Sequence, residues 1–199
     1  QNTNDPRLYR ICRHYYNIKR SQVKPDKEQN IDLTDDFLAY FQSKNLGEEP
    51  CNPGAAWYTD WMNPATVDDL PTLKKYAEID EGTYAISDYI ARAGRPCLNI
   101  DFEMPSCPGD LISYAEVEFL KAEAATKGWN VGGGDAESHY EAGVRASMEL
   151  LNNYYLTSNK ISKEEIDAFI ASNPLGDNPK ETINTQAWIL HMMNPSEGW

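Results

Sequence analysis

A helix–turn–helix stretch in the second half of the chain constrains the fold most, because two strongly helical segments are separated there only by a short glycine-rich turn. The first helix is expected over residues 110–127, followed by Gly128, the left-handed residue that commonly ends a helix. The second is expected over residues 135–152. Asp110 and Asp135 are the predicted N-caps, because a carboxylate can accept from the free N–H groups of a first turn.

The apolar residues of the first predicted helix fall on two sides at about 100° per residue. One side contains Leu111, Ile112, Ala115, Phe119 and Ala122, and the other contains Val117, Leu120 and Ala124. A helix with two apolar sides is expected to be buried on both. In the second helix, Ala136 and Gly143 place small residues around Tyr140. This pattern lets another helix approach closely, as in tetratricopeptide helix pairs.

The sequence of this helix pair resembles the signature region of the SusD/RagB family. The resemblance is carried by ISYAEVEFLKAEAATKGW at residues 112–129 and by HYEAGVRASM at residues 139–148. Shorter matches occur in the family's order on either side: Asn4-Asp5-Pro6-Arg7-Leu8 upstream, and Thr185-Gln186-Ala187-Trp188 and Glu197-Gly198-Trp199 downstream. The resemblance implies a mainly α fold, with a tetratricopeptide-like helix pair, long ordered loops and minor β structure.

The resemblance also implies a location and partners. Members of this family are surface lipoproteins of Bacteroidota that bind nutrients, mostly glycans, and sit on a SusC-like TonB-dependent outer-membrane transporter. Because family members are longer, residues 1–199 are expected to be the C-terminal portion of one SusD-like domain. Residues 1–109 would form its loop-rich ligand side and residues 110–199 its helical region. The signal and the lipid anchor are expected outside this segment, and the anchor would be the only contact with the membrane.

The charge and the cysteine content limit which classes of ligand and metal site are expected. The net charge of -13 and the absence of a dense lysine and arginine run argue against nucleic acid and suit neutral ligands. None of the four cysteines forms a CxxC pair, so a zinc site is not expected. Cys97 and Cys107 flank a proline-rich loop. They would either form a bridge in an oxidising compartment or remain buried or free thiols.

Further elements are predicted from caps, breakers and alternation. Residues 8–18 are expected to form a strand or irregular structure, residues 82–90 a short strand, and residues 91–109 a loop. Three more helices are expected: residues 35–45 after Thr34, one after the capping box of Ser162 and Glu165, and one after Asn178-Pro179.

The candidate ligand site lies in residues 49–64, EPCNPGAAWYTDWMNP, where proline, glycine and asparagine argue against regular structure. Large aromatic rings are unusual in such a loop unless they pack on something. The C–H face of a sugar can stack on a tryptophan or tyrosine ring, while amides and carboxylates bind its hydroxyl groups. The predicted ligand-binding residues are therefore Trp57, Tyr58, Asp60, Trp61 and Asn63. The alternative is that these rings anchor the loop to the core.

The sequence contains no HExxH, GxSxG or phosphate-binding glycine motif, so no catalytic residue, metal site or cofactor is predicted. The carboxylates that could serve a glycosidase are Glu116, Glu118, Glu123, Asp101 and Glu103. Calcium binding by acidic residues in loops is an alternative, although the sequence has no stretch with the spacing of an EF-hand. The expected function is non-catalytic capture of a nutrient, most simply an oligosaccharide. A helical scaffold for peptide or protein is the alternative, and a glycoside hydrolase is less favoured.

Overall fold

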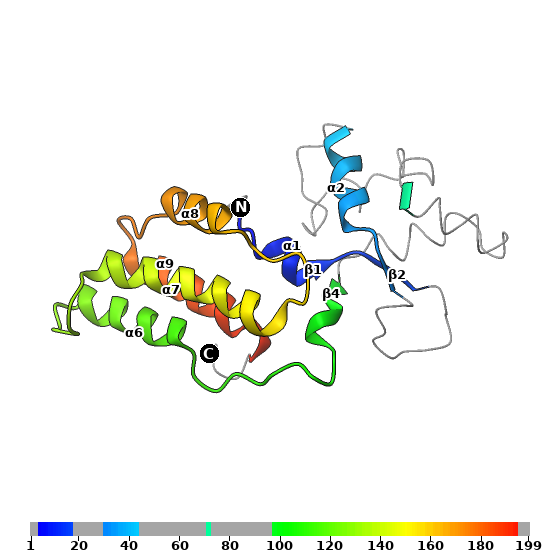
Figure 1. The fold of residues 1–199 in the computed structure, drawn as a ribbon. Helices are drawn as coiled ribbons and strands as arrows, with labels where there is room; N and C mark the ends of the chain where they lie inside the picture. The colour runs from blue at the N-terminus through cyan, green and yellow to red at the C-terminus, as the bar shows by residue number, and fades with distance from the viewer. Residues whose placement is uncertain (1–3, 18–29, 44–70, 73–96, 195–199) are drawn as a thin grey trace. The chain divides into compact units, whose positions relative to one another are not determined.

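The structure is a computed structural model that describes residues 4–17, 30–43, 71–72 and 97–194 (Figure 1). The chain divides into two units, residues 1–7 with 106–199 and residues 8–105. We call the described part of the first the helical unit and that of the second the frame unit. The fold is mainly helical, with short strands confined in the described residues to the frame unit, so the predicted fold class is confirmed.

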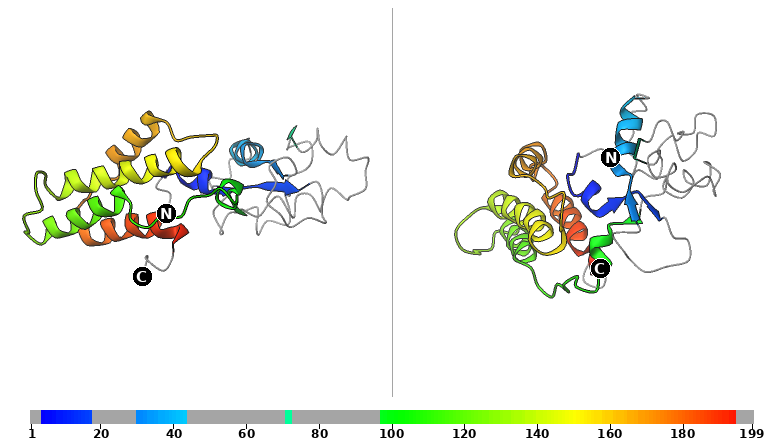
Figure 2. Two further views of the ribbon diagram at one scale, coloured as in Figure 1. Left: turned by 60° about the horizontal axis from the view of Figure 1, so that its bottom comes forward. Right: turned by 45° about the vertical axis from the view of Figure 1, so that its right-hand side comes forward.

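The helical unit is built on the predicted hairpin. Its helices are α6 (Tyr114–Thr126), α7 (Ala136–Leu150), α8 (Lys163–Ser172) and α9 (Pro179–Leu190). A π-helical turn, η3 (Leu151–Tyr155), continues α7, and a 3-10 turn, η4 (His191–Met193), continues α9. The hairpin helices α6 and α7 pack side by side, and α9 packs against both (Figure 2).

The start of α6 differs from the prediction. The helix begins at Tyr114 rather than near Asp110, and its cap is Ser113, whose hydroxyl accepts from the backbone N–H of Glu116 at 3.1 Å. The reason is local: Ser113 and Glu116 have the spacing of a capping signature, and Pro108 and Gly109 precede Asp110. The predicted cap of α7 is confirmed, because the Asp135 carboxylate accepts from the N–H of Ser138 at 2.8 Å.

Burial of α6 is one-sided among the described residues, so the prediction of burial on both sides is wrong for them. Ala115, Phe119 and Ala122 are buried, whereas Leu120 is 60% exposed. The buried side packs closely against α7 at Gly143. A side chain there would place its Cβ 2.6 Å from carbons of the Phe119 ring, closer than atoms can pack. The prediction that a small residue permits close helix approach is therefore confirmed.

The two later helices begin as predicted. Ser162 and Glu165 form a reciprocal capping box before α8, with bonds of 3.2 and 2.8 Å. Asn178 is the N-cap residue of α9, and Pro179 occupies its first turn. The side chain of Asn178 donates to Glu181 rather than accepting from the helix backbone.

The described part of the frame unit combines two α-helices with two short antiparallel ladders. It contains α1 (Leu8–Ile11), β1 (Cys12–Arg13), β2 (Tyr15–Asn17), β3 (Asn30–Asp32), α2 (Thr34–Ser43), β4 (Cys97–Leu98) and the 3-10 turn η2 (Ile100–Phe102). Strand β1 pairs with β4, and β2 pairs with β3. The predicted helix after Thr34 is confirmed. Within residues 8–18, the first four residues form a helical turn, and the predicted strand structure follows as β1 and β2.

Other predictions in this unit have mixed outcomes. The expected loop over residues 91–109 contains β4 and η2, so it is more regular than its prolines and glycines indicate. The strand expected at residues 82–90 lies outside the described residues. Cys97 and Cys107 are not joined by a disulfide bond, so the structure shows the thiol alternative rather than the bridge.

Candidate functional site

The five predicted ligand residues, Trp57, Tyr58, Asp60, Trp61 and Asn63, lie outside the described residues. The structure does describe how the segment that contains them is attached. This segment leaves α2 at Ser43, and the chain is described again at Pro71 and Thr72. The attachment of Thr72 therefore defines where the other end of the segment is held.

Thr72 is bound to α2 through one carboxylate. Its backbone N–H donates to Oδ2 of Asp36 at 2.7 Å, and its hydroxyl donates to Oδ1 at 2.8 Å. Asp36 lies in the first turn of α2, and the helix ends at Ser43. These two positions are separated by roughly 10 Å along the helix axis, at 1.5 Å per residue. The described residues on either side of the segment with the predicted site, Ser43 and Thr72, are therefore both held at α2.

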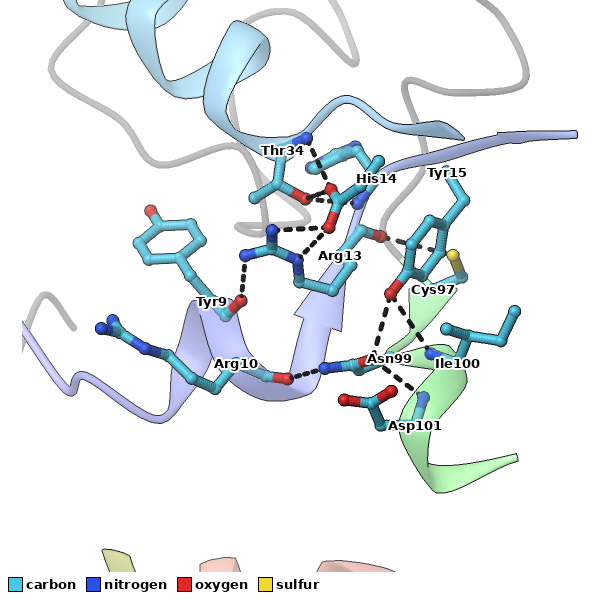
Figure 3. A network of polar contacts seen from close by, with 11 residues as sticks. Tyr9, Arg10, Arg13, His14, Tyr15, Thr34, Cys97, Asn99, Ile100 and Asp101 are labelled. Atoms are coloured by element: carbon cyan, nitrogen blue, oxygen red, sulfur yellow. Dashed lines mark hydrogen bonds and ion pairs between the residues drawn. The ribbon is translucent and has the colours of Figure 1, made fainter. Parts of the chain in front are cut away.

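The start of α2 is itself fixed by a charged network (Figure 3). The Arg13 guanidinium binds Oδ2 of Asp32 through Nε at 2.8 Å and Nη2 at 2.6 Å, and donates to the Tyr9 carbonyl at 2.7 Å. The other oxygen of Asp32 accepts from the N–H and hydroxyl of Thr34. The Thr34 hydroxyl oxygen in turn accepts from the backbone N–H of His14 at 2.9 Å. These bonds connect β1, β3 and α2.

A second cluster holds the chain where β4 ends and η2 begins (Figure 3). The Tyr15 hydroxyl donates to Oδ1 of Asn99 at 3.0 Å and accepts from the N–H of Ile100 at 3.3 Å. The Asn99 amide donates to the Arg10 carbonyl at 2.7 Å. Burial raises the pKa of Tyr15, which keeps its hydroxyl protonated as a donor.

These clusters are not predicted by the sequence, because their partners are far apart along the chain; the only signal is the aromatic and basic composition of residues 7–20. The polar groups named here bind one another. Their arrangement supports strands and a helix rather than presenting free donors to a ligand.

In the helical unit, Arg7 is the centre of a buried cluster and is 1% exposed. Its guanidinium binds Asp5 through Nε at 3.0 Å and Nη2 at 2.6 Å. It also donates to Oγ of Ser147 at 3.1 Å and to Oε1 of Gln186 at 2.5 Å. The charge lies 5.6 Å from the centroid of the Phe169 ring. Asp5, Ser147 and Gln186 each accept a hydrogen bond from the guanidinium, so the buried charge is paired and hydrogen-bonded.

This cluster gives a physical meaning to the matched segments of the sequence. Arg7 comes from the upstream segment, Ser147 from the second signature helix, and Gln186 from the downstream segment. The three meet through the hydrogen bonds of one guanidinium. Part of the sequence resemblance therefore reflects a buried cluster that stabilises the helical unit, and not a ligand site.

The candidate carboxylates of α6 are not brought together. Glu118 is 3% exposed and binds Nδ1 of His139 at 2.6 Å and Nζ of Lys121 at 2.8 Å. Glu123 instead pairs with Lys127 at 2.7 Å. Hydrogen bonds hold Glu118 in a paired, buried state, as a buried carboxylate requires. In the described residues, no three histidine, cysteine or acidic side chains are grouped to hold a metal ion.

The Glu118 pair makes stability depend on pH. Burial opposes ionisation, but hydrogen bonds from Lys121 and His139 outweigh it and lower the pKa of Glu118. A group with a lowered folded-state pKa stabilises the fold above its unfolded pKa of about 4.3, and that contribution is lost as the pH falls through the folded value. We expect the free energy of unfolding of Glu118→Gln to fall less than that of wild type between about pH 5 and pH 3.

Urea denaturation at a series of pH values measures this difference. Glu123→Gln is the matched control, because it removes a more exposed carboxylate from the same helix. Its pH profile should follow that of wild type. Identical profiles for all three proteins would contradict the assigned role of Glu118.

A groove of about 450 Å³ lies in the helical unit between the start of α6 and the end of α7. Its apolar lining includes Ile112, Tyr114, Leu150 and Tyr154, and its acidic lining is Asp110 and Glu149. Tyr114 and Tyr154 are both exposed. The groove therefore offers apolar surface rimmed by carboxylates, and none of the described residues that line it is basic.

Comparison with known proteins identifies the family of the chain. A family model described as "SusD-like_2: Starch-binding associating with outer membrane" matches residues 58–199. The chain belongs to the SusD-like family. The solved structure named "Bacteroidetes AC2a SusD-like" is 35% identical in sequence, with a TM-score of 0.76. This SusD-like chain covers 39% of that protein, while 99% of its own length is matched.

Two other comparisons add little. A solved chitin-binding protein is 31% identical over 54% of this SusD-like chain and 23% of its own, with a TM-score of 0.49, too low to support an argument. No curated protein matches the sequence. Among the described residues, no helix is both long and apolar enough to span a membrane.

Proposed function

We propose that this SusD-like chain belongs to a non-catalytic protein that binds a nutrient, most simply an oligosaccharide, at the cell surface. The observation that carries the proposal is the family match over residues 58–199, since that family is described as starch-binding and associated with the outer membrane. The bound sugar would be delivered to a SusC-like TonB-dependent transporter. Attachment would use a lipid anchor outside these 199 residues.

The proposed ligand site is the aromatic loop, with Trp57, Tyr58 and Trp61 as stacking rings and Asp60 and Asn63 as hydroxyl partners. The attachment of both ends of its segment to α2 supports this assignment. A loop fixed at both ends loses less conformational entropy when it closes on a ligand than a loop held at one end. A preorganised aromatic loop on a rigid frame is a common form of binding site.

One set of assays distinguishes the proposed function from its two alternatives. Isothermal titration with oligosaccharides of different composition should give saturable binding, and the same sugars should be recovered without new reducing ends. Binding of peptides but of no sugar would favour the helical scaffold alternative. Release of reducing ends, lost on replacement of a single carboxylate, would favour a glycoside hydrolase.

Asp36 is predicted to position the aromatic loop. Asp36→Ala removes both hydrogen bonds to Thr72, each worth about 0.5–1.5 kcal/mol, so oligosaccharide affinity should fall about tenfold. Calorimetric titration measures the change, and circular dichroism should show an unchanged helix content.

Asp35→Ala is the matched control, because Asp35 lies in the same first turn and is exposed. It removes the same charge from the helix N-terminus without releasing Thr72. Equal affinities for wild type and Asp36→Ala would show that the attachment of Thr72 does not position the site.

A further inference from the structure

The groove between the start of α6 and the end of α7 is lined by two exposed aromatic rings. Tyr114 and Tyr154 both contribute to its lining, and each is 65% exposed. The groove volume of about 450 Å³ lies within the range of small-ligand sites, which is roughly 300–1,000 Å³. Exposed tyrosine rings that line a recess of this size can stack on the C–H face of a sugar ring.

A π-helical turn forms one end of the groove. In η3 the backbone N–H of Leu156 donates to the carbonyl of Leu151 at 2.8 Å, so the hydrogen bond reaches back five residues instead of four. This turn contributes Asn153 and Tyr154 to the lining, together with Glu149 from α7. Because π-helical turns are rare and occur frequently at functional sites, η3 is a second observation that points to a ligand here.

The charged residues that line the groove are all acidic among the described residues. They are Asp110 and Glu149. Neither carboxylate forms a hydrogen bond or an ion pair with another described residue. Arg145, one turn before Glu149 on α7, is paired with Asp167 at 2.7 Å. Both carboxylates are therefore open to a positively charged group of a ligand.

The other polar groups of the lining are neutral. Tyr155 lines the groove and is buried, and burial followed by the negative charge of Asp110 raises the pKa of its hydroxyl. The hydroxyl therefore stays protonated and adds no charge. Asn153 adds an exposed amide that can bind a hydroxyl group. The lining thus combines carboxylates for a cation, rings for the face of a sugar, and neutral groups for hydroxyls.

We propose that this groove binds an amino sugar whose amine is unacetylated and protonated. The ammonium group would donate to the carboxylates of Asp110 and Glu149, and the sugar ring would stack on Tyr114 or Tyr154. The face of a tyrosine ring also attracts a cation. The inference deepens the proposed function and rests on it, because it names a class of sugar and adds a second subsite on the helical unit.

Two other ligands match the groove less completely. A neutral sugar can stack on the same rings, but it leaves both carboxylates without a counter-charge. A lysine side chain of a peptide carries the same ammonium group, but it offers neither a sugar ring to the tyrosines nor a hydroxyl group to Asn153. An amino sugar supplies all three kinds of contact.

Calorimetric titration of the natural full-length protein at about pH 6 tests the inference, because an amine of this kind is protonated there. The disaccharide of glucosamine is compared with its N-acetylated form, which has the same rings without the charge. Both are also titrated into Trp57→Ala, which removes the proposed site of the aromatic loop. In that variant we expect the glucosamine disaccharide to bind about tenfold more tightly than the N-acetylated form, because hydrogen bonds to charged groups are the stronger ones.

Two substitutions assign this binding to the groove. Glu149→Gln and Tyr154→Ala should each lower the affinity for the glucosamine disaccharide about tenfold. Both side chains are exposed, so circular dichroism should show an intact fold. Glu141→Gln is the matched control, because Glu141 is an exposed carboxylate of the same helix outside the groove lining. It should bind the disaccharide as wild type does.

Several outcomes would overturn the inference. These are equal affinities for the two disaccharides in Trp57→Ala, an unchanged affinity in either groove variant, or tighter binding of an N-acetyl-lysine amide than of the glucosamine disaccharide. The proposed function would survive each of them if neutral oligosaccharides bound wild type and not Trp57→Ala. If no oligosaccharide bound at either site, both the inference and the proposed function would fail.

Discussion

Replacing Arg7 with alanine is expected to lower the free energy of unfolding by about 3–5 kcal/mol. The substitution leaves the Asp5 carboxylate without its cation and removes the donor to Ser147 and Gln186. Since Arg7 is almost fully buried, water cannot replace these bonds without opening the helical unit. Urea denaturation followed by circular dichroism measures the loss.

Arg145→Ala is the matched control for this prediction. Arg145 pairs with Asp167 at 2.7 Å, but both side chains are more than one-third exposed. Exposed pairs of this kind contribute about 1 kcal/mol or less. If the two variants lost similar stability, the Arg7 cluster would not be a main stabilising contact between the matched sequence segments.

The second large effect is expected on ligand binding. Trp57→Ala or Trp61→Ala should abolish measurable oligosaccharide binding, a loss of about 2 kcal/mol or more for a ring that stacks on the sugar. The fold should remain intact, because a ring that binds the ligand is not needed to fill the core. Titration calorimetry measures binding, and the urea midpoint measures folding.

Trp129→Ala serves as the control, because it removes an exposed indole far along the chain from the aromatic loop. It should bind sugar as wild type does. Wild-type affinity in either loop variant would exclude that ring from the site. Unfolding of both loop variants would show that the rings anchor the loop to the core.

The sequence predicts the helical unit well because its signals are local. The caps Asp135 and Ser162 and the small residue Gly143 act within a few residues or across one hairpin. The start of α6 was misplaced because Asp110 and Ser113 are both good caps, and only Ser113 has a glutamate three residues on. Burial on both sides of that helix was inferred from periodicity, which cannot tell whether the covering residues lie within the chain.

The frame unit shows the limit of such reasoning. Tyr15 and Asn99 meet across a large sequence separation, and no local pattern joins them. Thr72 and Asp36 are also remote in sequence, with a separation of 36 residues. The aromatic loop could be proposed from composition, because large aromatic residues among turn residues are unusual. Its anchoring on α2 became visible only in the structure.

The most direct test of the proposed function is a tryptophan-fluorescence titration of the natural full-length protein, and of its Trp57→Ala variant, with neutral and acidic oligosaccharides. We expect a saturable change with at least one sugar in the wild type and no saturable change in the variant. Failure of every sugar to change the fluorescence or to release calorimetric heat would contradict oligosaccharide binding. It would favour a peptide-binding or purely structural role.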